Sequence, residues 1–186
     1  VLTLLGVVYY KNFELYKSKA LFQMLEKKED NDICMHYLGL FALDEERYMD
    51  GISYFQKALS LKPNNAQYAF DLANAYYLNG WIDEAVKFFN EAILREPDNK
   101  EFLYALAYLY YRNNEYEKTN SNVSKILKID ENYLPAKILK ALVKLETKDV
   151  LGAKFELEQL VTLESSDDFA VFSLAKIYIE LGMYEK

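Results

Sequence analysis

Small residues recur in this chain at a fixed interval of 34 positions, and this period limits the possible folds more than any other feature. The series begins at Gly39 and continues through Ala73, Ala107, Ala141 and Ala175. Bulky apolar residues follow with the same period: Phe55, Phe89, Val123 and Leu157. A period of this length indicates one structural unit that is repeated along the chain and buries its apolar face against its neighbours.

Each 34-residue unit contains two stretches with the spacing of an amphipathic helix. In residues 66–99, apolar residues lie three and four positions apart both before and after Gly80. Asn114 and Gly182 take the place of Gly80 in two other units, and both residue types tolerate a positive φ. Pro97 then ends the second stretch, because proline cannot continue a helix. The recurrent small residues therefore lie where two antiparallel helices approach closely.

This pattern resembles the tetratricopeptide repeat, whose consensus places a Leu, a Tyr, a Phe, a Pro and several small residues at fixed offsets. Residues 66–99 match that consensus at Leu72, Ala73, Tyr76, Ala85, Phe89, Ala92 and Pro97. The resemblance covers residues 32–186 and implies an all-α fold, a right-handed superhelical solenoid of antiparallel helix pairs. The expected units are residues 1–31 as a degenerate or capping repeat, then 32–65, 66–99, 100–133, 134–167, and a truncated repeat at 168–186.

Two segments depart from the pattern. In residues 1–31 the spacing between the two apolar halves is expected to differ from that of the later units. In residues 134–167, positions that are apolar in other units hold Lys137, Lys140 and Lys144, and burying three unpaired ammonium groups is too costly. We therefore expect the first helix of this unit to be slipped by one residue, which exposes the lysines. They then form either a solvated face or a small basic strip for an acidic partner segment. The adjacent apolar stripe consists of Ile138, Ala141, Leu142 and Leu145.

The sequence offers little for catalysis. His36 is the only histidine, and it lies two positions from the only cysteine, Cys34, so the two side chains point apart on a helix. No zinc-binding or nucleotide-binding motif is present, so we expect no enzyme, no metal and no cofactor. A net charge of −7, from 22 basic and 29 acidic residues, argues against general nucleic-acid binding. Nor do we expect a small-molecule substrate.

The resemblance implies a binding groove lined by the first helix of each unit. At the matching positions the sequence is rich in Tyr and Phe: Ile33, His36, Leu40, Leu43, Gln67, Phe70, Asn74, Tyr77, Leu78, Glu101, Tyr104, Tyr108, Tyr111, Arg112, Phe169, Phe172, Lys176 and Ile179. The partner-binding candidates are Phe70, Asn74, Tyr77, Tyr104, Tyr108 and Tyr111, with Lys137 and Lys144 from the basic strip. Alternatively, the rings reflect packing between first helices. The tyrosines assigned to the core are Tyr48, Tyr76, Tyr110 and Tyr116.

These observations favour a scaffold for protein–protein interaction that holds a peptide or a helical segment of a partner in an aromatic concave groove. Two alternatives remain: a secretion-type chaperone for apolar segments, and an assembly or regulatory domain of a larger, membrane-anchored protein. A homodimer through the exposed ends of the array is also possible. The opening ten residues, VLTLLGVVYY, are too few to span a bilayer. We expect a cytoplasmic protein; the alternative is a periplasmic or membrane-anchored one, with the opening residues as the tail of a membrane helix.

Overall fold

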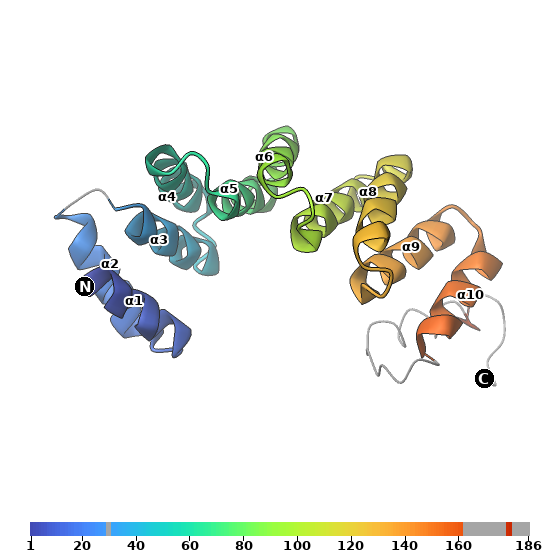
Figure 1. Cartoon of the computed structure of the whole chain (residues 1–186), viewed down its shortest axis with the longest axis horizontal. Coiled ribbons are helices and arrows are strands. Elements are labelled where there is room, and N and C mark those ends of the chain that lie inside the picture. Colours follow the sequence, from blue (N-terminus) through green and yellow to red (C-terminus); the bar gives the residue numbers. More distant parts are fainter. Residues whose placement is uncertain (29–30, 162–177, 180–186) are drawn as a thin grey trace. The chain divides into compact units, whose positions relative to one another are not determined.

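The computed structural model describes residues 1–28, 31–161 and 178–179, and it divides into two compact units, Val1–Pro97 and Asp98–Lys186 (Figure 1). We call these the N-terminal and the C-terminal unit and describe each by itself. The N-terminal unit holds six helices: α1 (Leu2–Lys11), α2 (Leu15–Glu26), α3 (Asp32–Asp44), α4 (Tyr48–Leu61), α5 (Ala66–Leu78) and α6 (Ile82–Arg95). The described part of the C-terminal unit holds four: α7 (Lys100–Arg112), α8 (Tyr116–Ile129), α9 (Leu134–Glu146) and α10 (Val150–Val161).

Consecutive helices pack as antiparallel pairs, which confirms the all-α repeat fold. The pairs are α1–α2, α3–α4 and α5–α6 in the N-terminal unit, and α7–α8 and α9–α10 in the C-terminal unit. No helix in the described ranges combines the length and the apolar composition that crossing a membrane requires.

The small residues lie at the closest approach within a pair. A Cβ atom added to Gly39 would lie 2.6 Å from the ring of Phe55, so the ring occupies the space that a larger residue would need. Gly6 and Phe22 repeat this contact, with a Cβ-to-ring distance of 2.7 Å. Both pairs are separated by 16 positions in the sequence. The expected difference in spacing within residues 1–31 was therefore wrong, because α1 and α2 pack through the same contact as α3 and α4.

A left-handed residue closes every turn inside a described pair. Gly80 and Asn114 have φ values of 82° and 60°, as the sequence predicted. Phe13, Glu46 and Lys148 take the same conformation at the matching positions, with φ between 59° and 65°. In each turn the N–H of the next residue bonds to a carbonyl five positions earlier, as Trp81 does with Tyr76. This bond satisfies carbonyl groups that the end of the helix leaves free. Gly182 lies outside the described residues.

Asparagine caps three of the first helices. The side chains of Asn31, Asn65 and Asn99 each accept a hydrogen bond from the backbone N–H three residues later, at 3.0 to 3.2 Å. Such a cap satisfies one of the free N–H groups at a helix start. The fourth residue of the series is Tyr133, which provides no side-chain cap to α9. Pro135 in the first turn of α9 partly replaces the cap, because proline has no N–H to satisfy.

The lysines of α9 have polar partners at the rim of the core: Glu156 for Lys140 and Lys144, and Asn132 for Lys137. α9 begins at the same position in its repeat as α3, α5 and α7, and its buried residues include Ile138 and Ala141 of the expected apolar stripe. Leu142 and Leu145 are half-buried and pack against the same cluster. All three lysines are half-buried rather than fully exposed. The lysines thus stay out of the core, as the sequence predicted, whereas the slip of the helix stays a prediction.

Candidate partner-binding surface

Five tyrosines of the C-terminal unit form a continuous row of ring contacts, which we call the tyrosine row. Successive centroid-to-centroid distances are 6.2 Å, 6.3 Å, 6.3 Å and 6.2 Å. In order, the row consists of Tyr133, Tyr104, Tyr108, Tyr111 and Tyr116. All five side chains are half-buried, so each ring packs on the protein and still presents surface to solvent.

Local helix geometry explains the middle of the row. Tyr104, Tyr108 and Tyr111 are four and three residues apart on α7, a spacing that places side chains on one helix face. Tyr116 begins α8 immediately after the turn, and Tyr133 precedes α9. The tyrosine row therefore begins just before α9, follows one face of α7 and ends at the first residue of α8.

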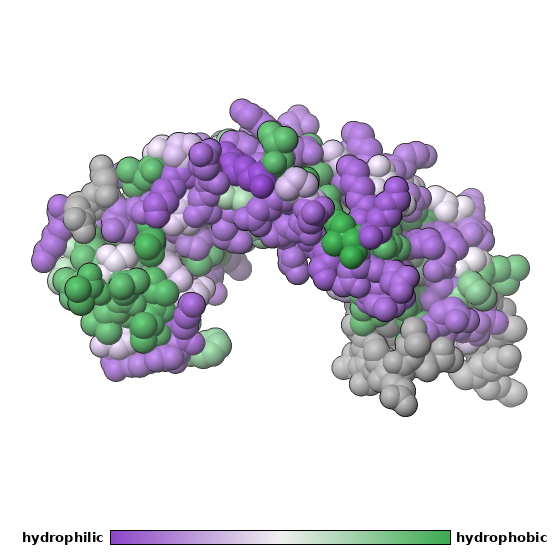
Figure 2. Space-filling model, in the orientation of Figure 1, coloured by the Kyte–Doolittle hydropathy of each residue, from purple (hydrophilic) through white to green (hydrophobic). Residues whose placement is uncertain are grey.

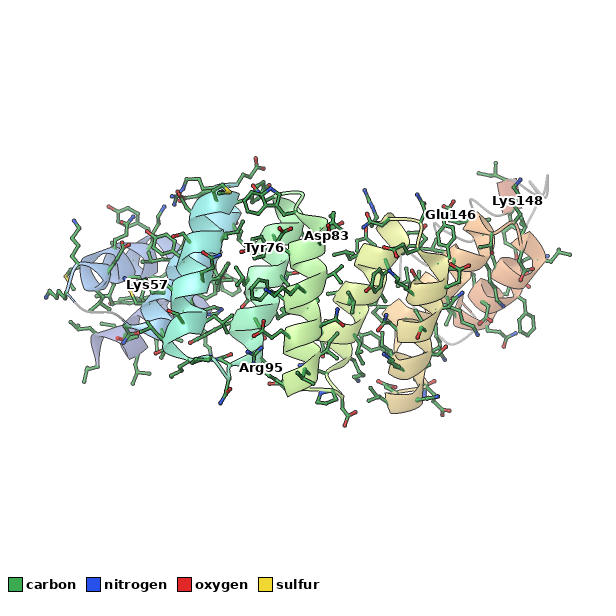
Figure 3. The ribbon with its side chains drawn as sticks, turned by 90° about the horizontal axis from the view of Figure 1, so that it is seen from above. Lys57, Tyr76, Asp83, Arg95, Glu146 and Lys148 are labelled. Atoms are coloured by element: carbon green, nitrogen blue, oxygen red, sulfur yellow. The ribbon has the colours of Figure 1, made fainter. Side chains whose placement is uncertain are left out.

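Polar groups border the row at both ends. At one end the ammonium group of Lys100 lies 5.2 Å from the centroid of the Tyr133 ring and 2.7 Å from a carboxylate oxygen of Asp130. At the other end the Tyr111 hydroxyl donates a 3.4 Å hydrogen bond to Glu146. Glu146 is labelled in Figure 3 at the end of α9. A shallow cavity of about 260 Å³ opens here, lined by Tyr111, Arg112, Asn114, Tyr116 and Glu146.

The surroundings of Tyr104 and Tyr111 hold their hydroxyl groups in the protonated form, because the pKa of each is raised. Burial raises the pKa of Tyr104, and its neighbours Tyr108 and Tyr133 raise it further. Burial also raises the pKa of Tyr111, to about 12, and the negative charge of Glu146 adds to that shift. The row thus presents neutral rings with O–H donors, a surface suited to apolar and hydrogen-bonding groups of a ligand.

The N-terminal unit places its candidates in a more polar setting. Phe70 is half-buried on α5, with its ring centroid 5.5 Å from that of Phe89 on α6. Asn74 and Tyr77, further along α5, are also half-buried. On the neighbouring helix α3, Nε2 of His36 lies 2.7 Å from a carboxylate oxygen of Asp71. These contacts join α3 to α5. A series of ring contacts in the N-terminal unit runs instead from Tyr10 through Tyr37 and His36 to Tyr68, and this series includes neither Phe70 nor Tyr77.

The two candidate lysines lie apart from the ring contacts. Lys137 donates a 3.2 Å hydrogen bond to Asn132, just before α9. Lys144 donates a 2.8 Å hydrogen bond to Glu156 on α10. Of the remaining groove candidates, Ile179 is exposed, whereas Phe169, Phe172 and Lys176 lie outside the described residues.

Two members of the row were not expected from the sequence. Tyr116 had been assigned to the core, but it is half-buried and its ring contacts that of Tyr111. Tyr133 was missed because it lies in a turn and not on a first helix. A signal for it existed, since Tyr133 interrupts the series Asn31, Asn65 and Asn99. Tyr76 and Tyr110 are buried as expected, and Tyr48 is half-buried.

The potential nucleophile and base of the N-terminal unit serve the fold separately. The thiol of buried Cys34 donates to the carbonyl of Phe22 at 3.2 Å, whereas His36 pairs with Asp71. This agrees with the prediction that the two side chains point apart. Within the described ranges, no three His, Cys, Asp or Glu side chains gather in a way that could hold a metal ion.

Comparison with known proteins identifies the repeats. Two family models described as tetratricopeptide repeat match the sequence, one over residues 42–98 and the other over residues 82–118. The chain therefore contains tetratricopeptide repeats (TPRs) within residues 42–118. The search of curated proteins finds no match.

Solved TPR structures share the fold at low sequence identity. A TPR protein from Parabacteroides merdae is 18% identical, with a TM-score of 0.85 over 98% of this chain and 73% of that one. A thermophilic TPR protein from Thermus thermophilus is 14% identical, with a TM-score of 0.72 over 96% and 97% of the two chains. YrrB, a TPR protein with an unusual peptide-binding site, is 14% identical, with a TM-score of 0.64 over 88% and 84%.

Family membership sets the general role of the domain. TPR domains are generally modules for protein–protein interaction, and members of this scaffold family are typically non-catalytic. This general role agrees with the prediction of a non-enzymatic interaction domain.

Proposed function

We propose that this TPR domain holds an extended segment of a partner protein against the tyrosine row of its C-terminal unit. Tyrosine provides a large contact area with few rotatable bonds, and its hydroxyl adds hydrogen bonding, which makes it frequent at binding hot spots. The half-buried state of all five rings supports this role, because each ring is held in place by the fold and still exposes part of its surface.

The spacing of the rings suits an extended ligand. Neighbouring centroids are 6.2 to 6.3 Å apart. In an extended β-strand, side chains on the same side are about 6.4 to 6.8 Å apart, close to this ring spacing. Alternate side chains of a bound segment can therefore contact successive rings. YrrB shows that a domain of this fold can bind a peptide, and the same mode of use is what we propose here.

Tyr133 is the observation that carries the proposal. Its position is used for capping in the three preceding repeats, where Asn31, Asn65 and Asn99 accept a hydrogen bond from the following helix. Loss of such a cap costs about 1 kcal/mol. Folding alone would favour asparagine at position 133, whereas the tyrosine extends the row by one ring and lies beside Lys100.

In the N-terminal unit we propose Phe70, Asn74 and Tyr77 as further partner contacts. They lie along one helix, α5, and all three are half-buried. Lys137 and Lys144 of α9 complete the set of proposed partner-binding residues.

Selection from a displayed peptide library against the intact chain tests the proposed function. We expect the selected peptides to share alternating apolar residues, and to lose at least about 2 kcal/mol of binding free energy in the Tyr104→Ala variant. The free energy of unfolding should fall by less than this, because the side chain of Tyr104 is partly exposed without a ligand.

Tyr16→Ala is the matched control, because Tyr16 is 88% exposed on α2 and takes no part in the row. The proposal is wrong if the selected peptides bind Tyr104→Ala and Tyr16→Ala equally well. We expect only a weak dependence of affinity on salt concentration, since few charges pair across such a contact.

A chaperone and a self-assembling domain are the second candidates, and the exposed face of α1 favours them. Apolar residues gather on the surface over α1 and α2 (Figure 2), where Leu4 and Val8 are 65% and 49% exposed. Sedimentation of the chain with and without Leu4→Glu separates the two: a dimer that the variant dissociates indicates self-assembly. Suppression of aggregation of an unfolded client by a monomer, abolished by the same variant, indicates a chaperone.

A further inference from the structure

The C-terminal unit contains a second hollow that the tyrosine row does not include. It lies between α8 and α9 and has a volume of about 430 Å³. Its polar lining comes from Asn120, Ser124 and Lys128 of α8 and from Lys140 and Lys144 of α9. Its apolar lining comes from Val123 and Leu127. We call this hollow the α8–α9 groove; it shares no lining residue with the tyrosine row.

The groove carries an excess of positive charge. The ammonium groups of Lys140 and Lys144 lie 2.8 Å from the same carboxylate oxygen of Glu156 on α10. One acidic side chain thus serves two basic ones. Lys128 lines the same groove and forms no ion pair with any residue that the structure describes. Three ammonium groups against one carboxylate leave a local surplus of two positive charges, although the whole chain has a net charge of −7.

Glu156 is held ionised by this pairing. Burial by itself would raise the pKa of its carboxyl group, but hydrogen bonds from Lys140 and Lys144 outweigh burial and hold the pKa below its ordinary value. The site therefore already favours a carboxylate, and a second one could share the two ammonium groups.

The matching interface between α4 and α5 contains packed side chains at the positions that line the α8–α9 groove. Two repeats before the groove, between α4 and α5, the positions of Asn120 and Lys140 hold Ile52 and Leu72, which are 4% and 1% exposed. The position of Lys144 holds Tyr76, labelled in Figure 3. Its hydroxyl accepts a 2.8 Å hydrogen bond from Gln56, which occupies the position of Ser124.

The residues that differ are therefore those that open and charge the groove. Apolar or long side chains fill the interface between α4 and α5, whereas Asn120 and Ser124 are short and the lysines extend toward Glu156. Apolar residues at these places would stabilise the fold by burying more hydrocarbon surface. Packing does not account for lysines on α9, and binding of a negatively charged group does.

We propose that the α8–α9 groove is a second binding site, which takes an acidic segment of a partner protein. The ammonium groups of Lys128, Lys140 and Lys144 hold carboxylates of the segment, and the amide of Asn120 and the hydroxyl of Ser124 supply further hydrogen bonds. Val123 and Leu127 offer a contact for an aliphatic side chain between those carboxylates. The volume of the groove, about 430 Å³, lies within the usual range of ligand pockets.

A labelled peptide with alternating pairs of glutamate and single leucines, and a copy with glutamine in place of glutamate, test the proposal by fluorescence anisotropy with the full chain. The acidic peptide should bind and its glutamine copy should not. Lys140→Leu, which restores the residue of the α4–α5 interface, should weaken binding at least about tenfold. The melting temperature of this variant should be equal to or above that of the wild type, so that loss of binding is not loss of folding.

Two further variants separate binding from structure. Lys125→Leu removes one charge from α8 outside the groove and should leave the affinity within about twofold of wild type. Glu156→Gln removes the competing carboxylate and should increase the affinity at least about threefold while lowering the melting temperature. Equal effects of Lys140→Leu and Lys125→Leu, or weaker binding to Glu156→Gln, would overturn the proposal.

Inorganic phosphate serves as a competitor to define the ligand class. If millimolar phosphate displaces the peptide completely, the groove is only a general anion site and the proposal of a peptide site is wrong. If the peptide stays bound, the aliphatic and hydrogen-bonding contacts contribute as proposed. Tyr104→Ala should leave this peptide's affinity unchanged, so failure here is distinguishable from failure of the tyrosine row.

Discussion

Tyr133 differs from the residues at the same position of the three preceding repeats in what its side chain contacts. Its counterparts Asn31, Asn65 and Asn99 cap a helix, and the chemistry of asparagine makes that role readable from the sequence. The shared face of Tyr104, Tyr108 and Tyr111 was also predictable from the sequence, because their helical spacing alone places them on one side of α7. The contact between Tyr133 and Tyr104 joins a turn to a helix of the preceding repeat, so it depends on packing between repeats that no local pattern specifies.

Restoring the cap at this position should separate stability from binding. Tyr133→Asn should raise the free energy of unfolding by up to about 1 kcal/mol, because a side-chain acceptor again satisfies an N–H at the start of α9. The same change removes the end ring of the tyrosine row and should weaken binding of a peptide selected on the intact chain. Urea unfolding and calorimetric titration measure the two effects. A variant that loses both stability and binding would show that Tyr133 is a packing residue.

Tyr111 should titrate late because of its surroundings. Burial is the larger cause and the charge of Glu146 the next, and together they raise its pKa to about 12. The stability that accompanies a raised pKa is fully present below the unfolded value of about 10 and is lost as the pH rises through the folded value. Glu146→Gln removes the charge but not the burial, so the pKa of Tyr111 should fall and still exceed 10.

Titration of tyrosinate absorbance measures this shift, with Tyr111→Phe identifying the late component. An unchanged titration curve in Glu146→Gln would contradict the contact between the Tyr111 hydroxyl and Glu146.

At the scale of elements, the turns within helix pairs show where local sequence signals stop. At Gly80 and Asn114 the residue type predicts a left-handed conformation, because glycine and asparagine adopt positive φ readily. Phe13, Glu46 and Lys148 adopt it without any such signal. The pairing of the flanking helices determines their conformation, since each turn closes with the same backbone hydrogen bonds. The period of the repeat is thus a better guide to these three turns than their residues are.

Replacing Lys148 by glycine should accordingly stabilise the chain. Its φ of 65° is strained for a side chain with a Cβ atom, so Lys148→Gly should raise the free energy of unfolding by about 0.5–1 kcal/mol. Lys125→Gly is a matched control in the exposed middle of α8 and should lower it by about 1 kcal/mol. Chemical denaturation of the two variants measures whether each change raises or lowers the free energy of unfolding. Destabilisation by both would mean that the turn holds Lys148 through its side chain.

The lysines of α9 illustrate a conflict that the sequence revealed and packing resolved. Their places in the repeat predicted burial, and their charge excluded it unless they were paired. A shift of the helix was the simplest answer available from the sequence. Glu156 provides another one, because it lies on the next helix at a distance that no spacing within α9 could indicate.

At the scale of the molecule, the repeat period and the resemblance that rests on it were enough to predict the fold, because small and large residues recur at positions where paired helices meet. Gly6 with Phe22 and Gly39 with Phe55 are two instances. The interaction role follows from the family. The candidate surface was predictable only in part, because a period specifies what the repeats share. The tyrosine row and the α8–α9 groove depend on Asn120, Tyr133, Lys140 and Lys144, where two repeats depart from the others.

A chain built from such pairs should lose stability locally. Ala85 has no exposed surface in α6, so Ala85→Leu should overpack the α5–α6 pair and lower the free energy of unfolding by about 1–3 kcal/mol. In a repeat array each element contacts mainly its neighbours, and stability is close to a sum over repeats and their interfaces. Amide hydrogen exchange should therefore accelerate in α5 and α6 far more than in α9 and α10.

Ala20→Leu is the control for the change of residue, because Ala20 is exposed on α2 and a larger side chain meets no packed neighbour there. Its exchange should match that of the wild type throughout the chain. If Ala85→Leu instead accelerates exchange equally in all helices, the chain unfolds as one cooperative core. A single repeat could then not depart from the pattern without disturbing the others, and residues such as Tyr133 and Lys140 would no longer point to a function.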